Sequence, residues 1–333
     1  MPAQGIVCHD VRNPAQRSEV LVRKGSELGA SEIDALLERG IQEIHVAVAD
    51  AGDVDEDAAA QRLARAIAGT HISVGEAHFG QTNLVSTERG MLRIEASRLD
   101  RVNAHAGVLA LTAEPDRPID AGTTVGVVKC APLFLAEATL RAIENLGATA
   151  GPVVQVEPFQ VRRVALVAPR DRLRAGAFDR AQTALSDALA WYGSSLDDVV
   201  GAETTVEALA AAYAEARSAG ADLILAAGAS GTDPLDVVFE GLRDAGGEVL
   251  QLGIPAEPGT ACWIGRLGTV PVLGLASCEL FGQPGALDLL LPQLLTGAPL
   301  DLDLTRGLAL GGLLLGPPRI APHHAARSTP AGK

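Results

Sequence analysis

Residues 221–236 read ADLILAAGASGTDPLD, in which an apolar run passes into glycines and hydroxyl-bearing residues and then reaches Asp236. A short apolar run that is bounded by turn residues is typical of a strand buried on both faces. An aspartate directly in front of an apolar segment of helical spacing is a frequent N-cap. We therefore expect a buried strand, a loop over residues 226–236 and a helix over residues 237–247.

The same alternation of strands and helices continues on both sides of this stretch. Further strands are expected in RVALVAP (163–169), GEVLQLGIP (247–255) and TVPVLGLAS (269–277), and helices in FDRAQTALSDALAWYG (178–193) and TVEALAAAYAEARSAG (205–220). Strands rich in Val, Ile and Leu that alternate with amphipathic helices indicate a parallel sheet covered on both faces. The predicted fold class is α/β, with a doubly wound, mostly parallel three-layer sheet in residues 156–300.

The first half of the chain is expected to be a smaller α+β domain that covers residues 1–155. Residues 19–49 predict a strand, a turn, a helix and another strand, with Ser31 as the helix N-cap and Gly40 at the helix end. Helices are also predicted within residues 53–69 and 135–147, and short strands joined by tight turns within residues 100–130.

Residues 151–163 contain two prolines and little periodicity, so we expect a linker there and a domain boundary near residue 155. Residues 301–333 form a C-terminal extension. Its last part, residues 317–333, has no apolar face and is expected to be disordered.

Composition and charge limit the classes of function. The 333 residues carry a formal net charge of −14, which repels nucleic acid and anionic membrane surfaces. The four cysteines are far apart and form no C-x-x-C pair, so the sequence indicates neither a disulfide framework nor a zinc site. The N-terminus lacks the apolar core of a signal peptide, and no apolar run is long enough to span a membrane. We expect a soluble, cytoplasmic protein.

Ligands of open parallel sheets bind at the carboxyl ends of the strands, and the loop after residue 226 contains residues suited to binding. Gly228 allows close approach of the backbone, Ser230 and Thr232 offer hydroxyl groups, and Asp233 and Asp236 precede a helix. A helix N-terminus can hold an anionic oxygen, or a carboxylate can cap it. A purely structural role, with Asp236 as N-cap and Gly228 as turn residue, fits the local pattern equally well.

Two further loops and one charged segment contribute candidate residues. Glu257-Pro258-Gly259 forms a rigid turn that would present backbone groups to a ligand, or would only connect two elements. Ser277, Cys278 and Glu279 follow a predicted strand, and Cys278 fits a buried thiol better than a nucleophile. Asp171 lies between arginines, and this charged segment would either steer a phosphate to the loop or be a solvated charge cluster.

Several familiar binding patterns are absent from the sequence. No G-x-G-x-x-G follows the first strand and no G-x-x-x-x-G-K-[ST] occurs, so neither dinucleotide-binding nor P-loop chemistry is supported. The histidines do not have the i, i+4 spacing of a helical zinc site.

Taken together, the loops of the second half resemble the molybdopterin-binding domain of molybdopterin adenylyltransferases, molybdopterin molybdotransferases and competence-damage-inducible nucleotide hydrolases. That family has G-G-x-S-x-G-x-x-D or a related pattern after its central strand, then a P-G-K-P turn, then G-x-L-x-x-x-P-V-x-G-L-P-G-N-P. The resemblance covers roughly residues 161–297. The matching residues are Gly228, Ser230 and Asp236 in the first element, Pro258 and Gly259 in the second, and Gly265, Leu267, Pro271, Val272, Gly274 and Leu275 in the third.

The first half resembles molybdotransferases more faintly, in the segment VLVRKGSELGASEIDALLERGIQEIHV. The layout of the whole chain resembles the molybdopterin-binding-like proteins that accompany a molybdenum cofactor nucleotidyltransferase. Relatives of the second domain commonly self-associate, but the sequence does not give the oligomeric state of this chain, so a homo-oligomer stays open.

The chain also departs from the family at positions that bear on catalysis. The resemblance implies a substrate-facing turn at residues 276–279, which read Ala-Ser-Cys-Glu where the family has P-G-N-P. Thr260 replaces the lysine of P-G-K-P. In the adenylyltransferases a second carboxylate precedes the helix before the central strand. Here that register gives Thr205, with Glu203 two residues earlier. Two carboxylates would be needed to hold Mg²⁺ on a nucleotide phosphate, and the resemblance places only Asp236.

The resemblance implies a protein that binds molybdopterin, or a nucleotide form of it, in the biosynthesis or delivery of the molybdenum cofactor. Gly228, Ser230 and Asp236 would contact the pterin or its phosphate, with Thr232 and Asp171 nearby and the Pro258-Gly259 turn and Ser277 opposite. Whether the chain is itself an enzyme stays open, and an active form would be of the transferase type.

Two alternatives remain. In the first, Asp233 and Asp236, with Glu203, hold Mg²⁺ for nucleotidyl transfer or for hydrolysis of a nucleotide pyrophosphate. In the second, the chain is a docking subunit for a cofactor nucleotidyltransferase or a molybdoenzyme and has no small ligand of its own.

Overall fold

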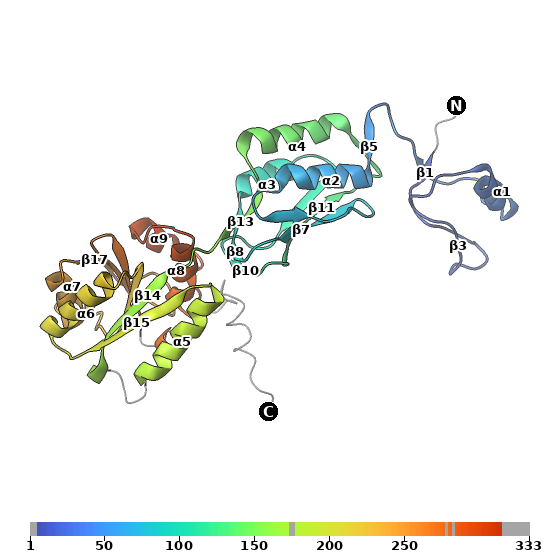
Figure 1. The fold of residues 1–333 in the computed structure, drawn as a ribbon. Helices are drawn as coiled ribbons and strands as arrows, with labels where there is room; N and C mark the ends of the chain where they lie inside the picture. Colours follow the sequence, from blue (N-terminus) through green and yellow to red (C-terminus); the bar gives the residue numbers. More distant parts are fainter. Residues whose placement is uncertain (1–4, 173–176, 277–278, 282–283, 315–333) are drawn as a thin grey trace. The chain divides into compact units, whose positions relative to one another are not determined.

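The structure is a computed structural model that describes residues 5–172, 177–276, 279–281 and 284–314. The chain divides into two compact units. Unit 1 comprises Met1–Glu88, Leu92–Pro115 and Ala121–Val156, and unit 2 comprises Arg89–Met91, Asp116–Asp120 and Glu157–Lys333. Helices alternate with strands of several sheets (Figure 1), so the chain is a mixed α/β protein, which confirms the predicted class at that level.

The chain up to residue 158 contains short strands and four helices among the described residues. The elements are β1 (Ile6–Val7), β2 (Val11–Arg12), β3 (Val20–Val22), α1 (Ala30–Glu38), β4 (Val46–Ala47), β5 (Asp53–Asp55), α2 (Glu56–Ile67), β6 (Ile72–Val74), β7 (Gln81–Ser86), β8 (Gly90–Ile94), α3 (Ala96–Asn103), β9 (Val108–Thr112), β10 (Pro118–Ile119), β11 (Thr124–Cys130), β12 (Phe134–Ala136), α4 (Glu137–Ala150) and β13 (Val154–Pro158).

Helix α2 covers one face of the four-stranded sheet of unit 1, whose strand order is β6-β7-β11-β9. The helix begins where the Asp55 carboxylate accepts from the N–H groups of Asp57 and Ala58, and acidic residues in its first turn favour the helix dipole. Its buried residues recur at helical spacing and end with Ile67. Helix α4 packs closely on α2 at Gly147. A Cβ there would lie 2.1 Å from the carbonyl oxygen of Ala66, so the absence of a side chain allows the contact.

The outer edge of β9 is closed by a side chain. The Asn103 side-chain amide donates to the carbonyl oxygen of Ala110 over 2.8 Å and accepts from the Ala110 N–H over 2.7 Å. Asn103 is the last residue of α3, so the helix end delivers this amide to the strand. The backbone groups of Ala110 that point away from β11 therefore already have partners.

Unit 2 is built around one six-stranded sheet. Its elements are β14 (Arg163–Pro169), the 3₁₀ helix η1 (Arg170–Arg172), α5 (Ala177–Trp191), β15 (Ser195–Ala202), α6 (Val206–Ser218), β16 (Leu223–Ala226), α7 (Val237–Asp244), β17 (Glu248–Leu252), β18 (Trp263–Leu267), β19 (Val270–Gly274), the 3₁₀ helix η2 (Glu279–Phe281), α8 (Ala286–Leu295) and α9 (Leu302–Gly307).

The strand order of this sheet is β15-β14-β16-β19-β18-β17. The first four strands are parallel, and β18 runs antiparallel to both of its neighbours. Alternate residues of β14 enter different cores: Val164 and Leu166 pack in the cluster that holds residues of α5 and α8, while Val167 packs in the cluster that holds residues of α6 and α7. Helices α6 and α7 lie side by side in Figure 1.

Several expected elements differ from the structure. Strand β15 and strand β18, at residues 263–267, were not expected. Residues 151–163 are not an unstructured linker, since β13 pairs within the sheet β10-β8-β13. The first long helix has Gly29 rather than Ser31 as its N-cap, because the Glu32 side chain reaches back to the Gly29 N–H.

Strand β18 was missed because Gly265 and Arg266 interrupt its apolar pattern. A two-residue turn joins it to β19, with Leu267 opposite Val270 and Gly268 at a φ of 64°. Gly274 lies opposite Trp263, and a Cβ there would be 1.9 Å from the indole nitrogen. The glycine thus makes room for the largest side chain of this core.

No helix within the described ranges is long and apolar enough to cross a membrane. Residues 317–333, expected to be disordered, lie outside the described residues.

Candidate functional site

The carboxyl ends of the four parallel strands lie at one edge of the sheet in unit 2. Residues 203–205 follow β15, residues 170–172 follow β14, residues 227–236 follow β16, and residues 275–276 follow β19. All the candidate residues of the loop after β16, together with Asp171, therefore come to this edge. Ser277 also follows β19, but Ser277 and Cys278 lie outside the described residues.

The loop after β16 is a chain of tight turns. Gly228 has a φ of 81°, and a Cβ there would lie 3.0 Å from Pro169, so the loop approaches the end of β14 closely. The Asp233 N–H donates to the Ser230 carbonyl and the Asp236 N–H to the Asp233 carbonyl. Residues 230–235 are exposed, and the Ser230 and Thr232 hydroxyl oxygens are 3.1 Å apart.

Asp236 points inward from this loop and is only 4% exposed. As predicted, it is the N-cap of α7: its Oδ1 accepts from the Val238 N–H over 2.9 Å. Its Oδ2 accepts from the Ser230 N–H over 3.1 Å and from Arg172. Burial raises the pKa of the Tyr213 hydroxyl, and the negative charge of Asp236 raises that pKa further. The hydrogen bonds of the buried Asp236 carboxylate fix the shape of the loop.

The two arginines of η1 join neighbouring strand ends. Arg172 Nη1 donates to the Gly228 carbonyl oxygen over 3.0 Å as well as to Asp236. Arg170 Nε donates to the carbonyl oxygen of Gly201 at the end of β15, and its guanidinium lies over the Phe178 ring at 5.2 Å. The remaining N–H groups of both side chains donate to none of the described residues.

Asp171, between these arginines, bonds to the segment that follows β15. It is exposed and accepts a hydrogen bond from the Thr204 hydroxyl, next to the exposed Glu203. Asp233 is exposed as well, and its Oδ1 accepts from the Leu235 N–H. The carboxylates of Asp171 and Asp233 therefore lie at the surface of the edge, whereas that of Asp236 does not.

The Pro258-Gly259 turn adjoins the loop after β16 on its other side. A Cβ at Gly231 would lie 3.7 Å from the carbonyl oxygen of Ala261. Gly259 itself is buried with a φ of 126°, and a Cβ there would lie 2.4 Å from that of Ala286. The turn is therefore packed onto the first residue of α8, and Pro258 is only partly exposed.

Side chains already cap three helices that begin at this edge. The Thr205 hydroxyl accepts from the Ala208 N–H at the start of α6, and Asp236 caps α7. At α8, Glu279 accepts from the Leu287 N–H and Asp288 from the Gly285 N–H. Since these amide groups have internal partners, the η1 arginines are better placed than the three helix ends to receive an anionic group.

Sequence reasoning named Asp171 and overlooked Arg170 and Arg172 as site residues. The available signal was their place directly after a buried strand at the carboxyl edge. Their function in the fold could not be read from sequence, because the partners of Arg172 are 56 and 64 residues away along the chain.

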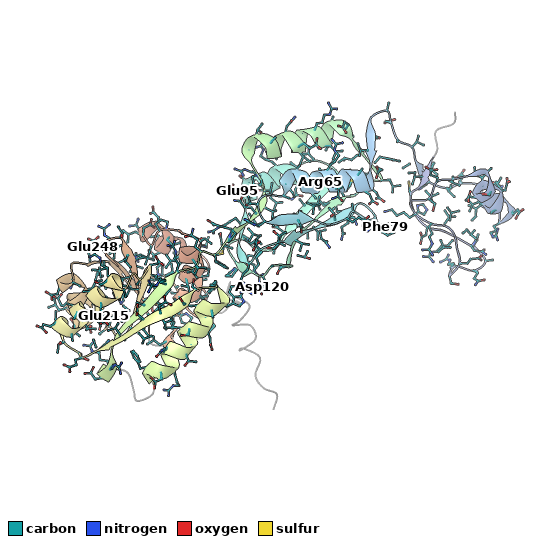
Figure 2. The ribbon with its side chains drawn as sticks, viewed as in Figure 1. Arg65, Phe79, Glu95, Asp120, Glu215 and Glu248 are labelled. Carbon is teal, nitrogen blue, oxygen red and sulfur yellow. The ribbon has the colours of Figure 1, made fainter. Side chains whose placement is uncertain are left out.

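Glu279 was expected in the turn that faces the substrate, and the structure corrects this expectation. Its side chain is 2% exposed and points into the protein. Among the described residues, no three His, Cys, Asp or Glu side chains are grouped closely enough to hold a metal ion. Figure 2 shows the side chains, with Glu215 labelled on the exposed side of α6, the helix whose Tyr213 is buried.

Comparisons with known proteins give little to add to this geometry. No protein-family model matches the chain, and no curated protein matches it. Among solved structures 36 chains match. One is the crystal structure of a molybdopterin biosynthesis MoeA protein from Pyrococcus horikosii, which is 17% identical, is matched over 74% of each chain and has a TM-score of 0.33. The function proposed for this chain rests on its own loops and not on this similarity.

Proposed function

We propose that the carboxyl edge of the sheet in unit 2 binds molybdopterin or a nucleotide form of it, in the biosynthesis or delivery of the molybdenum cofactor. The domain would be the doubly wound, three-layer fold that the sequence resemblance implies. Support comes from the loop after β16, where residues that match the family pattern, Gly228, Ser230 and Asp236, lie together at the edge where such sheets bind ligands.

The observation that carries the proposal is the contact of Asp236 with both Arg172 and the Ser230 N–H. These contacts hold a buried carboxylate beneath the loop and turn small residues and hydroxyl groups outward. A preformed loop of this kind binds a ligand without first having to be ordered. Asp236 would therefore shape the loop, while Ser230 and Thr232 would donate to or accept from the ligand.

The chemistry of the edge suits a pterin that carries a phosphate. A pterin ring has several hydrogen-bond donors and acceptors in its plane, which hydroxyl groups and exposed loop amides can match. A phosphate would take the unused N–H groups of Arg170 and Arg172, because guanidinium groups bind phosphate oxygens in a planar, bidentate manner. The negative net charge of the chain would make this binding weaker at low ionic strength than local contacts alone suggest.

The Mg²⁺-dependent alternative has less support. Both oxygens of Asp236 already accept hydrogen bonds, so that carboxylate would have to give up internal partners to hold a metal ion. Asp233, Asp171 and Glu203 are exposed carboxylates at the same edge and would be the residues to test. Docking to a nucleotidyltransferase or a molybdoenzyme is a further alternative proposal. Self-association of the chain is another.

The test is an anaerobic titration of the protein with molybdopterin, followed by pterin fluorescence. We expect the wild type to bind. The double variant Ser230→Ala, Thr232→Val should bind on the order of tenfold more weakly, because it removes two hydroxyl groups that would bond to the ligand. Valine keeps the branched shape of threonine. Arg170→Gln should weaken binding of molybdopterin more than binding of the pterin without phosphate.

Arg266→Gln is the matched charge control. It removes one positive charge from β18, opposite Pro271 near the amino end of β19, and should leave affinity unchanged. Affinity that is the same in wild type and in the Ser230 and Thr232 variant would refute the site. Turnover of a nucleotide on addition of Mg²⁺, abolished by Asp233→Asn, would favour the enzymatic alternative.

A further inference from the structure

Glu279 makes hydrogen bonds to three separate segments of unit 2. Its Oε2 accepts from the Cys262 thiol over 2.7 Å and from the Ala276 N–H over 3.2 Å, and its Oε1 accepts from the Leu287 N–H over 2.9 Å. Cys262 precedes β18, Ala276 follows β19, and Leu287 is the second residue of α8. One buried carboxylate therefore joins the starts or ends of three elements.

Two of these segments border the proposed ligand site. The Cys262 N–H donates to the carbonyl oxygen of Gly259, so the thiol contact extends to the Pro258-Gly259 turn. Ala276 belongs to the segment that leaves the carboxyl end of β19, and its N–H also lies 3.3 Å from the Cys262 sulfur. Any displacement of Glu279 would thus reach both segments at once.

The surrounding residues leave space for this carboxylate. A Cβ at Gly285 would lie 2.4 Å from Glu279 Oε1, so only glycine at that position allows the carboxylate to reach the start of α8. Gly285 is the N-cap of α8, and its own N–H bonds to Asp288. Two carboxylates therefore bond to the start of α8. Asp288 bonds within the helix end, and Glu279 connects the helix to Cys262 and Ala276.

We propose that Glu279 is a positioning residue that holds the Pro258-Gly259 turn, the segment after β19 and the start of α8 in one fixed arrangement beside the ligand site. This inference rests on the proposed function, because it assigns the arrangement to ligand binding. It also goes beyond that function, since the residue involved contacts no ligand and lies where the family resemblance implied a substrate-facing turn.

The energetic basis is the cost of leaving buried polar groups without partners. Removal of the carboxylate would take the described acceptor from the Leu287 N–H and would leave the Ala276 N–H with only the Cys262 sulfur, a weak acceptor, in a buried site. A glutamine has one acceptor oxygen in place of two, so it could satisfy the Leu287 N–H or the Ala276 N–H and not both. Glu279→Gln should therefore be intermediate between the wild type and Glu279→Ala.

Hydrogen exchange of the full chain, read by mass spectrometry, tests the arrangement without any ligand. In Glu279→Ala we expect exchange to rise about tenfold or more, and together, in peptides covering residues 257–264, 274–276 and 286–289. Peptides covering residues 223–240 should not change. Asp288→Asn is the matched control, because the described hydrogen bond of Asp288 is to the Gly285 N–H at the same helix end; it should raise exchange only at the start of α8.

A rise confined to the start of α8 in Glu279→Ala would show an ordinary helix cap and overturn the proposal. If Glu279→Ala does not fold, Cys262→Ala replaces it: this variant removes the thiol arm and should raise exchange over residues 257–264 while α8 stays unchanged. No rise there would equally overturn the proposal.

Molybdopterin titration separates this inference from the proposed function. Glu279→Ala should bind about tenfold more weakly than wild type, while Asp288→Asn binds normally. Unchanged affinity in a Glu279→Ala protein whose three segments have loosened would refute the link to binding. A wild type that fails to bind molybdopterin would refute the proposed function, and the exchange experiment would still decide whether Glu279 holds the three segments together.

Discussion

Arg172 and Asp236 form an ion pair between residues 64 positions apart, in which the carboxylate is almost fully buried and the guanidinium is a third exposed. The pair joins the end of β14 to the start of α7, and the same guanidinium nitrogen also bonds to Gly228. The loop after β16 is thus held at its beginning and at its end by one side chain from a neighbouring strand.

Breaking the Arg172–Asp236 pair should lower the free energy of unfolding. Arg172→Ala leaves a buried carboxylate without its cation and should lower the free energy of unfolding by about 2–3 kcal/mol, less than for a fully buried pair because Arg172 is partly exposed. Arg172→Ala with Asp236→Asn should lose about 1 kcal/mol less than the two single losses added together. Urea unfolding of all four proteins measures the coupling, and strictly additive losses would contradict it.

The Pro258-Gly259 turn should tolerate no side chain at residue 259. Gly259→Ala adds a Cβ at a φ of 126° and 2.4 Å from the Cβ of Ala286, so both backbone strain and overpacking oppose it. We expect a loss of about 3 kcal/mol. Gly246→Ala is the control: its φ is 84° but nothing lies within 4 Å, so it should cost only the strain, about 1–2 kcal/mol. Equal losses in thermal unfolding would show that the contact with α8 has no effect.

The stability of unit 2 should carry a pH dependence from Glu279. Burial raises the pKa of this carboxyl above its usual value of 4.5, although the hydrogen bonds from Cys262, Leu287 and Ala276 act in the opposite direction. The folded state therefore holds the proton more tightly than the unfolded state, and this contribution to stability is complete below the unfolded pKa and is lost as the pH rises through the folded pKa. Glu279→Gln cannot titrate, so the difference in unfolding free energy between wild type and variant should change over that interval.

Denaturant unfolding from about pH 4 to about pH 8 measures that difference. A difference that is constant across the whole range would mean that the pKa of Glu279 is the same in the folded and the unfolded chain. Asp288→Asn, at the same helix end, removes a negative charge that raises the pKa of Glu279, so in this variant the change should occur at lower pH.

Alkylation should distinguish the cysteines of unit 1. Burial, together with the negative charges of the nearby Glu56 and Asp55, raises the pKa of the Cys130 thiol to about 11. At about pH 8 the native protein should therefore react with iodoacetamide at Cys8, which is partly exposed, far faster than at Cys130. Mass spectrometry of the digested protein gives both extents of reaction, and equal labelling under native conditions would contradict the burial of Cys130.

The sequence alone predicted the main elements of unit 2 because their patterns are local. The apolar runs at residues 163–169 and 223–226 form buried strands, and Asp236 begins a helix as its position indicated. Strands β18 and β15 were missed because glycine, arginine and aspartate break their apolar patterns, and pairing with other strands of the sheet holds them extended. Pairing of that kind is decided by the fold and not by the segment.

For the site, sequence predicted which loop lies at the carboxyl edge but not which way its acids point. Asp233 and Asp236 look alike in the sequence, yet one is exposed and the other is buried against Arg172. Glu279 was expected in a surface turn, but its side chain points inward to a thiol and two amide groups. For Asp236 the direction follows from Arg172, which lies 64 positions away, and for Glu279 it follows from donors on two elements that the fold brings to it. No local pattern reveals either arrangement.

The amide of Asn103 that occupies the free edge of β9 bears on how this protein behaves in concentrated solution. Unpaired strand edges recruit strands from other molecules, and Leu109 and Leu111 on the same strand are exposed enough to strengthen such an encounter. By bonding to both backbone groups of Ala110, Asn103 takes the place that an incoming strand would need. A single amide at the end of α3 thereby protects unit 1 against growth into aggregates through this edge.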